Sequence, residues 1–322
     1  MKKYILFASA VVALAACSSN EEMEQIANCE INLSSTLLVQ TRAAQDIQST
    51  AFDSEQTVDV FISESTTGTA STTYKQPLKY TTGTGGSLTP EDTPYFPQNG
   101  NGVNIIGLYP SGLTTNIKDD AVAFSVKSDQ STNVNYKASD LMVGKPENGN
   151  PVARTTSSIA LQFKHCLSKI NVNIKAGAGV SADVLDGATV TIYTRTNDAT
   201  FDVNREDVVT AVETQGQAAS PFVTMGTLIS SQNVFEGLSA IIIPQEIPAG
   251  SRFIMISITD GQSTTNYAYS LPTTENVIKF ESGYAYTYNL TVTKSGLVVD
   301  SSTISNWQDY GDVFNGEATP IP

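Results

Sequence analysis

The sequence predicts an all-β protein built from β-sandwich domains. Short segments in which apolar and polar residues alternate recur along the chain, and Gly, Asn, Thr, Ser and Pro fill the turns between them. β-Branched and aromatic side chains are abundant, and these favour pleated strands. Helical periodicity never persists beyond a few turns. Because roughly 280–300 residues remain after the N-terminal segment, we expect two domains of ordinary size.

The N-terminal segment has the order of a secretory signal. Lys2 and Lys3 precede an apolar run over residues 4–14, and Leu-Ala-Ala then leads to Cys17. A cysteine in this position resembles the bacterial lipobox, in which the thiol is acylated and becomes the first residue of the mature chain. We therefore expect residues 1–16 to be a signal peptide and Cys17 to carry lipid. The alternative is a plain signal peptide with a chance cysteine.

The composition limits the partners of the chain. Loss of residues 1–16 moves the formal net charge from −14 to −16, because two lysines leave and no acid does. Such an acidic surface repels nucleic acid, which we exclude as a partner. No later segment approaches the ~20 consecutive apolar residues of a membrane span. Cys29 and Cys166 are too few for a disulfide framework, so we expect two buried free thiols; a bridge between them is the alternative.

A clear strand follows the acidic tether of residues 18–25. Apart from Ser35, its inward parity carries only apolar residues: Cys29, Ile31, Leu33, Leu37 and Val39. The strand runs directly into Thr41-Arg42-Ala43. The tether is either a solvated linker or a segment that resembles the surface-export signal of some Gram-negative lipoproteins, and we favour surface display.

Further strands are expected at short intervals, over Val58–Ile62, Val103–Tyr109, Ala121–Val126, Leu141–Val143, Val190–Ile192, Ala240–Ile243 and Arg252–Thr259. The clearest strand spans Tyr284–Val292, whose large same-face residues predict a place at the centre of a sheet. In Ser158–Ala176 the apolar parity shifts near Ser168-Lys169, which indicates a β-bulge or a crossing between domains. Thr81–Ser87 predicts a flexible loop, and its glycines lack the strand–helix context of a phosphate cradle.

Catalytic chemistry finds almost no support in the sequence. His165 is the sole histidine and lies on the apolar face of an expected strand, so we interpret it as a core residue. Cys166 would point to the opposite face, which excludes a Cys–His dyad in a regular strand. A group of acids matches no ordered calcium loop, and weak calcium binding is the alternative for Asp198, Asp202, Glu206 and Asp207. We expect no enzyme activity, no metal and no cofactor.

Several motifs, taken in order, resemble one family. They are the lipobox at Cys17, Thr41-Arg42-Ala43, Asp-Leu-Met-Val at 140–143, Leu-Gln-Phe-Lys-His-Cys-Leu-Ser-Lys-Ile at 161–170, Ile-Ile-Pro-Gln at 242–245, the Phe-x-Ser-Gly-x-x-Tyr-x-Tyr pattern at 280–288, and Thr-Ile-Ser-Asn-Trp at 303–307. Over essentially the whole chain this set resembles the fimbrillin family, the lipoprotein-derived subunits of type V pili. The resemblance implies two tandem transthyretin-like β-sandwich domains, over residues 43–165 and 166–322, after a lipidated tether and removable strand over residues 17–42.

The resemblance also implies a mode of assembly. Fimbrillins are exported to the outer membrane as lipoproteins and cut after an arginine by a surface protease, and a strand of another subunit then fills the vacated groove. Arg42 and Ala43 are the expected cleavage pair. The donor-strand candidates are Leu297, Val299, Ile304 and Trp307, followed by Tyr310, Val313 and Phe314. The implied partners are other pilin subunits, in a homo- or hetero-polymer, and an arginine-specific surface protease. The implied destination is an adhesive fimbrium.

Other functions stay open. The alternation after Val299 is imperfect, because Ile304 and Trp307 have opposite parity. The donor strand is then bulged or bipartite, or the chain is an uncleaved anchor or a tip subunit. A different alternative is a monomeric surface lipoprotein that binds glycan or host protein through exposed aromatic residues, for which Tyr95, Phe96 and Trp307 are the candidates.

Overall fold

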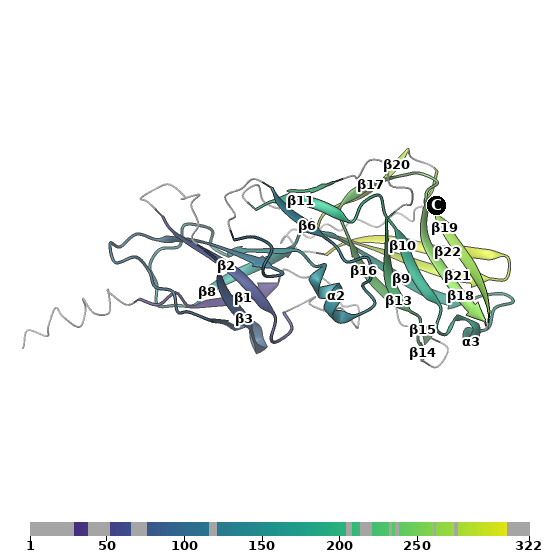
Figure 1. The fold of residues 1–322 in the computed structure, drawn as a ribbon, viewed down its shortest axis with the longest axis horizontal. Helices are drawn as coiled ribbons and strands as arrows, with labels where there is room; N and C mark the ends of the chain where they lie inside the picture. The colour runs from purple at the N-terminus through teal and green to yellow at the C-terminus, as the bar shows by residue number, and fades with distance from the viewer. Residues whose placement is uncertain are drawn as a thin grey trace, which may run out of the picture.

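The computed structural model describes residues 29–37, 52–65, 76–115, 121–203, 208–212, 221–231, 234–235, 238–260, 262–273 and 276–307. Two β-rich lobes follow one another along the long axis, with the N-terminal strands in one lobe and the C-terminal strands in the other (Figure 1). The sites expected at Cys17, Arg42 and Ala43, and the tail beyond Trp307, lie outside the described residues.

The N-terminal lobe is built on a seven-stranded sheet of order β1-β8-β7-β5-β2-β3-β4. Its strands are β1 (Leu33–Leu37), β2 (Thr57–Glu64), β3 (Leu78–Thr82), β4 (Leu88–Pro90), β5 (Val103–Tyr109), β7 (Met142–Pro146) and β8 (Ile159–His165), and the 3-10 helix η1 (Thr84–Gly86) joins β3 to β4. β1 pairs with β8 in parallel, whereas the other neighbours are antiparallel.

The C-terminal lobe contains two four-stranded sheets, β13-β10-β18-β19 and β16-β9-β21-β22. Their strands are β9 (Ser168–Ala176), β10 (Thr189–Tyr193), β13 (Phe222–Thr227), β16 (Leu238–Ile242), β18 (Arg252–Asp260), β19 (Ser263–Ser270), β21 (Tyr284–Thr293) and β22 (Gly296–Asn306). The rings of Phe253 on β18 and Tyr288 on β21 have centroids 5.5 Å apart, so the two sheets face each other as a β-sandwich.

Smaller elements complete the chain. They are β6 (Val122–Ser125), β11 (Asp198–Asp202) and β12 (Val208–Ala211) in one sheet, the pair β14 (Ser230–Ser231) and β15 (Val234–Phe235), the pair β17 (Gln245–Pro248) and β20 (Val277–Phe280), and the helices α2 (Asn133–Ala138) and α3 (Ala182–Leu185). These short helices leave the architecture all-β, as the sequence predicts.

Several sequence predictions are confirmed in detail. β5 has the predicted bounds, and β21 lies between β9 and β22, inside its sheet as expected. The parity shift in residues 158–176 arises because β8 ends at His165 and β9 begins at Ser168 in a sheet of the other lobe. Of the two explanations predicted for the parity shift, the crossing is therefore correct and the β-bulge near Ser168 is wrong. Both predicted thiols, Cys29 and Cys166, are buried, and no disulfide joins them.

Segment 121–131 joins the N-terminal half of the sequence to the C-terminal lobe. Its strand β6 pairs with β11 rather than with the seven-stranded sheet. The side-chain amide of Gln130 donates to the Ile241 carbonyl at 2.7 Å and accepts from the Ile241 N–H at 2.8 Å. This side chain thus supplies the two hydrogen bonds that a neighbouring strand would supply to β16. The domain limits 43–165 and 166–322 stay a prediction.

The core of the N-terminal lobe positions the candidate site. Phe163 of β8 is fully buried, and its ring lies over two glycines on neighbouring strands. A Cβ added at Gly107 or Gly144 would lie 2.5 or 2.6 Å from the Phe163 Cζ atom. The glycines therefore create the space for this ring, and the ring forms part of the core against which β1 packs.

Candidate functional site

β1 and the extended residues before it pair with the protein along both edges. On one edge, β1 runs parallel to β8, with Leu33 opposite Ile159 and Leu37 opposite Phe163. On the other edge, Ser34 bridges Ser87. Hydrogen bonds between residues 29–31 and 94–96 continue this second edge. We call the space between β8 and residues 87–96 the β1 seat. Its walls are main-chain ladders, so any extended strand of suitable side chains fits its chemistry.

The inward side chains of residues 29–37 form part of the N-terminal core. Four of these apolar side chains are at most 9% exposed, namely Cys29, Ile31, Leu33 and Leu37. Glu30, Asn32 and Thr36 point to solvent. Burial of each large aliphatic side chain contributes about 1.5–3 kcal/mol. Removal of the strand would uncover an apolar trough and two unpaired strand edges, which are strongly prone to association.

The contacts of Ser35 explain why one inward position of this strand is polar. It is 6% exposed, and its hydroxyl donates to the Gly86 carbonyl at 3.2 Å. Gly86 has a positive φ of 80°, and a Cβ at this position would lie 2.2 Å from the Ser35 carbonyl oxygen. The Thr81–Ser87 segment is thus not the flexible loop that its composition suggested. Its η1 turn holds the backbone of β1 at a position where only glycine allows such a close approach.

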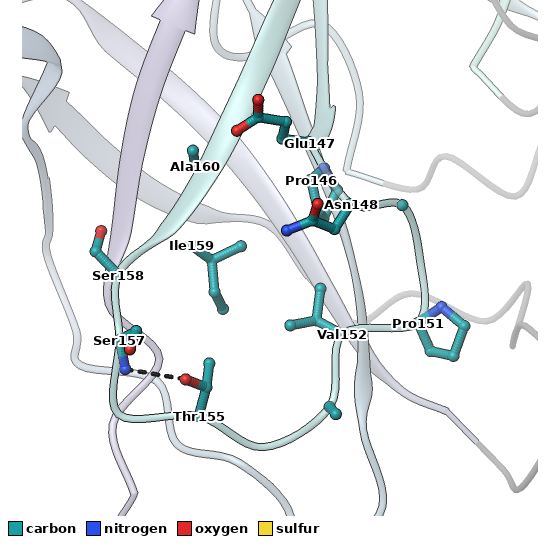
Figure 2. Close-up of a pocket in the computed structure, with 12 residues that line it drawn as sticks. Pro146, Glu147, Asn148, Pro151, Val152, Thr155, Ser157, Ser158, Ile159 and Ala160 are labelled. Carbon is teal, nitrogen blue, oxygen red and sulfur yellow. Dashed lines mark hydrogen bonds between the residues drawn. The ribbon is translucent and has the colours of Figure 1, made fainter.

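An open pocket of about 410 Å³ lies beside the start of this strand, between the β7–β8 connection and β8 (Figure 2). Two of its lining residues contact the strand: the Cys29 thiol donates to the Thr155 carbonyl at 3.4 Å, and the Ile159 N–H donates to the Asn32 carbonyl at 2.8 Å. Glu147 is the one titratable residue among the lining residues. The pocket therefore brings together no acid–base or nucleophilic set.

His165 occupies a buried junction between the lobes, as predicted for a core residue. It has no solvent exposure, and its Nδ1 atom lies 2.8 Å from Asp140 Oδ1. Trp307 stacks on it at 4.0 Å between centroids and 11° between planes. The Lys169 Nζ atom lies 5.7 Å from the centre of the Trp307 ring, and burial lowers the pKa of this lysine to about 7. We call these four residues the junction cluster.

Comparisons with known proteins agree with this geometry. The model of the fimbrillin-like family matches residues 41–307, which is most of the chain. The chain belongs to the fimbrillin-like family. A prokaryotic membrane lipoprotein attachment site matches residues 1–18 and so includes Cys17. The search of curated proteins found no significant match.

Two solved structures share the fold of this fimbrillin-like chain. A putative cell adhesion protein from Bacteroides uniformis is 22% identical, with a TM-score of 0.60, and the match covers 87% of this chain and 100% of that one. Another from Bacteroides ovatus is 19% identical, with a TM-score of 0.63, and the match covers 88% of this chain and 99% of that one.

Family membership makes the chain a pilin-type adhesion subunit that interacts with other pilin subunits, and not an enzyme. With the attachment site, it is a membrane-anchored surface or fimbrial protein. Among the residues that the structure describes, no helix combines the length and apolar character that crossing a membrane requires. Within the same residues, no three His, Cys, Asp or Glu side chains gather to hold a metal ion.

Three donor-strand candidates of this fimbrillin-like chain, Leu297, Val299 and Ile304, lie in β22 of its own C-terminal sheet, and Trp307 directly follows this strand. β22 is an edge strand that pairs antiparallel with β21, and the register shifts between Asn289 and Leu290 so that Asp300 is an extra residue. The bulge places Ile304 on the same face as Leu297 and Val299, and Trp307 lies beyond the end of the strand, so its parity is not bound to theirs. Leu297 and Val299 are half-buried, Ile304 is 44% exposed, and Trp307 is 4% exposed.

Two of the three aromatic side chains predicted to stack on glycans are buried. Tyr95 is 49% exposed, but Phe96 and Trp307 are 2% and 4% exposed. The prediction of an exposed aromatic set is therefore wrong for two of its three members. The burial of Phe96 and Trp307 could not be predicted from local alternation, because the residues that cover them come from distant segments of the chain.

Proposed function

We propose that the chain is a pilin that is lipidated at Cys17, carried to the outer membrane surface and cut between Arg42 and Ala43 by an arginine-specific protease. The cut releases the strand that fills the β1 seat. A strand of another subunit then takes its place, and repetition of this step builds a fimbrium.

The observation that carries the proposal is the double-edged pairing of residues 29–37. A strand that is buried on its inward face and paired on both edges closes the N-terminal core, and a single cut five residues after Leu37 would make it a separate peptide. Until that cut, the strand protects the trough from association. The match of the lipoprotein attachment site to residues 1–18 supports lipidation at Cys17.

The test is proteolysis of the purified chain in which Cys17→Ser prevents lipidation. An arginine-specific protease should produce an N-terminus at Ala43 and then oligomers, which size-exclusion chromatography resolves. Arg42→Ala should leave the chain uncut at this position and monomeric, while Arg154→Ala should leave cleavage at Arg42 unchanged. A chain that is cut after Arg42, loses residues 17–42 and stays monomeric would contradict the proposal.

A second candidate is an anchor or tip subunit that does not donate β22. Two observations favour it: β22 pairs with β21 over most of its length, and Trp307 is buried in the junction cluster of its own subunit. An anchor would keep residues 17–42 when fibres are purified from cells. N-terminal sequencing of the protein in such fibres separates an anchor from a cleaved subunit, because retention of lipidated Cys17 identifies the first and a start at Ala43 the second; a tip subunit that starts at Ala43 would be recognised by its failure to donate β22.

A further inference from the structure

β1 and β22 share a short pattern of side chains. On the inward face of β1 and the residues before it, Ile31, Leu33 and Ser35 follow one another at alternate positions, and Leu37 comes next. In β22, Leu297, Val299 and Ser301 follow one another with the same spacing, and Thr303 comes next. Resting on the proposed function, we infer that Leu297–Thr303 of a second copy fills the β1 seat in one register, with Ser301 in the place of Ser35.

The seat discriminates between registers at the Gly86 turn. The hydroxyl of Ser35 satisfies the Gly86 carbonyl, and the backbones of the two residues are in close contact. A small hydroxyl-bearing side chain meets this requirement, whereas a branched carbon would place apolar atoms against a carbonyl that then loses its partner. Ser301 supplies the hydroxyl, and Val299 and Leu297 then occupy the positions of Leu33 and Ile31.

A shift by two residues is unfavourable in either direction. It moves Val299 or Thr303, both β-branched, onto the Gly86 turn, and it moves Ser301 into a position shaped for Leu33 or Leu37. A β-branched residue at the turn crowds the backbone, and serine in a position shaped for leucine leaves a cavity. A shift by one residue would turn Val298 and Asp300 toward the core, which buries a charge. The matching register therefore has no close competitor.

β22 has features of a strand that can be exchanged. It lies at the edge of its sheet, Val298 is 49% exposed, and the bulge at Asp300 interrupts its ladder with β21. Straightening of the bulge returns Leu297, Val299, Ser301 and Thr303 to one face. Its departure also withdraws Trp307 from His165, so the sole tryptophan of the chain reports the step.

Cysteine cross-linking tests the register. Asn32 directly precedes β1, and continuing the parallel register back from the Leu33–Ile159 pair sets it opposite Ser158. Val298 of a donor should therefore lie beside Ser158 of its acceptor. The side chains of Ser158 and Val298 are exposed, so both positions tolerate substitution by cysteine. We mix cut Cys17→Ser chains that carry Val298→Cys with chains that carry Ser158→Cys, and we expect a disulfide-linked dimer on a non-reducing gel. Uncut chains should give none.

The donor variant Asp300→Cys serves as the register control. If it links to Ser158→Cys in place of Val298→Cys, the register is wrong. Oligomers without either dimer would show that β22 is not the donor and would overturn this inference alone. Cut chains that form no oligomer at all would overturn the proposed function and the inference together. An unchanged Trp307 emission spectrum during assembly would also contradict release of β22.

Two leucine substitutions on the same face of β22 provide a matched comparison. Ser301→Leu meets the Gly86 turn and should slow oligomer formation at least tenfold. Thr303→Leu restores the residue type of Leu37 and should keep or increase the rate. Both changes add a similar apolar group, so equal rates would contradict the inference. Thermal unfolding of the uncut variants identifies any loss that comes from the donor's own fold.

Discussion

Trp307→Ala should destabilise the fimbrillin-like subunit far more than a change at an exposed position of the preceding strand, β22. The side chain is 4% exposed, and a buried tryptophan removes roughly 150–250 Å² from water. At about 25 cal/mol per Å², this burial amounts to about 4–6 kcal/mol. Alanine keeps only the Cβ atom of that side chain, so we expect a loss of about 3–5 kcal/mol in the free energy of unfolding.

Far-UV circular dichroism in urea measures this loss. Val298→Ala is the control, because Val298 is 49% exposed on β22, the strand that leads to Trp307, and its truncation should cost no more than about 0.5 kcal/mol. Trp307→Phe keeps an aromatic ring over His165 and should fall between the two. A Trp307→Ala chain that unfolds at the same urea concentration as Val298→Ala would refute the anchoring role of Trp307 in the junction cluster.

Three further predictions concern the seat, the core and the junction. Gly86→Ala should speed hydrogen exchange at the amides of β1, because its Cβ would meet the Ser35 carbonyl at 2.2 Å, whereas Gly85→Ala has a similar positive φ with no neighbour within 4 Å and should leave these amides protected. Gly144→Ala should lower the free energy of unfolding by about 1–3 kcal/mol in a urea titration, because its Cβ would clash with Phe163. In the double variant, Phe163→Leu should cost much less than it does alone, because the smaller side chain relieves the clash. If the two losses of unfolding free energy simply add, the proposed contact is contradicted. Burial lowers the pKa of Lys169 from 10.5 to about 7, so between these values the unfolded chain holds a proton that the folded chain has lost, and stability rises with pH across this window. In Lys169→Met, the rise in the urea midpoint between about pH 7 and pH 10 should be smaller than in the unchanged chain; an equal rise would show that Lys169 is not its source.

Sequence alternation was sufficient where strands bury one face. β21 shows this pattern clearly, because its buried residues stand at alternate positions from Tyr286 to Val292. β5 is buried on both faces, and a short run of mainly apolar residues marks it instead. β19 was missed because its side chains are mainly exposed Ser, Thr, Asn and Tyr, so no apolar period signals it. That strand exists because the edge of β18 offers a ladder of unpaired groups, which is a tertiary condition.

The candidate site was predicted in outline but not in its contacts. The inward row from Cys29 to Leu37 and the break at Ser35 were visible in the sequence. The reason for the break was not, because it depends on a glycine turn about fifty residues away whose close approach has no local signature. The stacking of Trp307 on His165 likewise joins two segments that only the fold brings together.

The pairing of segment 121–131 with strands of the C-terminal lobe affects how the subunit responds to a pulling force. In a fibre built by the proposed strand exchange, tension would pull on each subunit between the strand it receives and the strand it gives. In two lobes joined by one linker, that force would straighten the linker and then peel the strands apart. Here the chain passes between the lobes more than once, and β6–β11 and the Gln130–Ile241 pair tie the passages together. Separation of the lobes would therefore require several of these hydrogen bonds to break together, and we expect the subunit to resist tension better than two lobes joined by one linker.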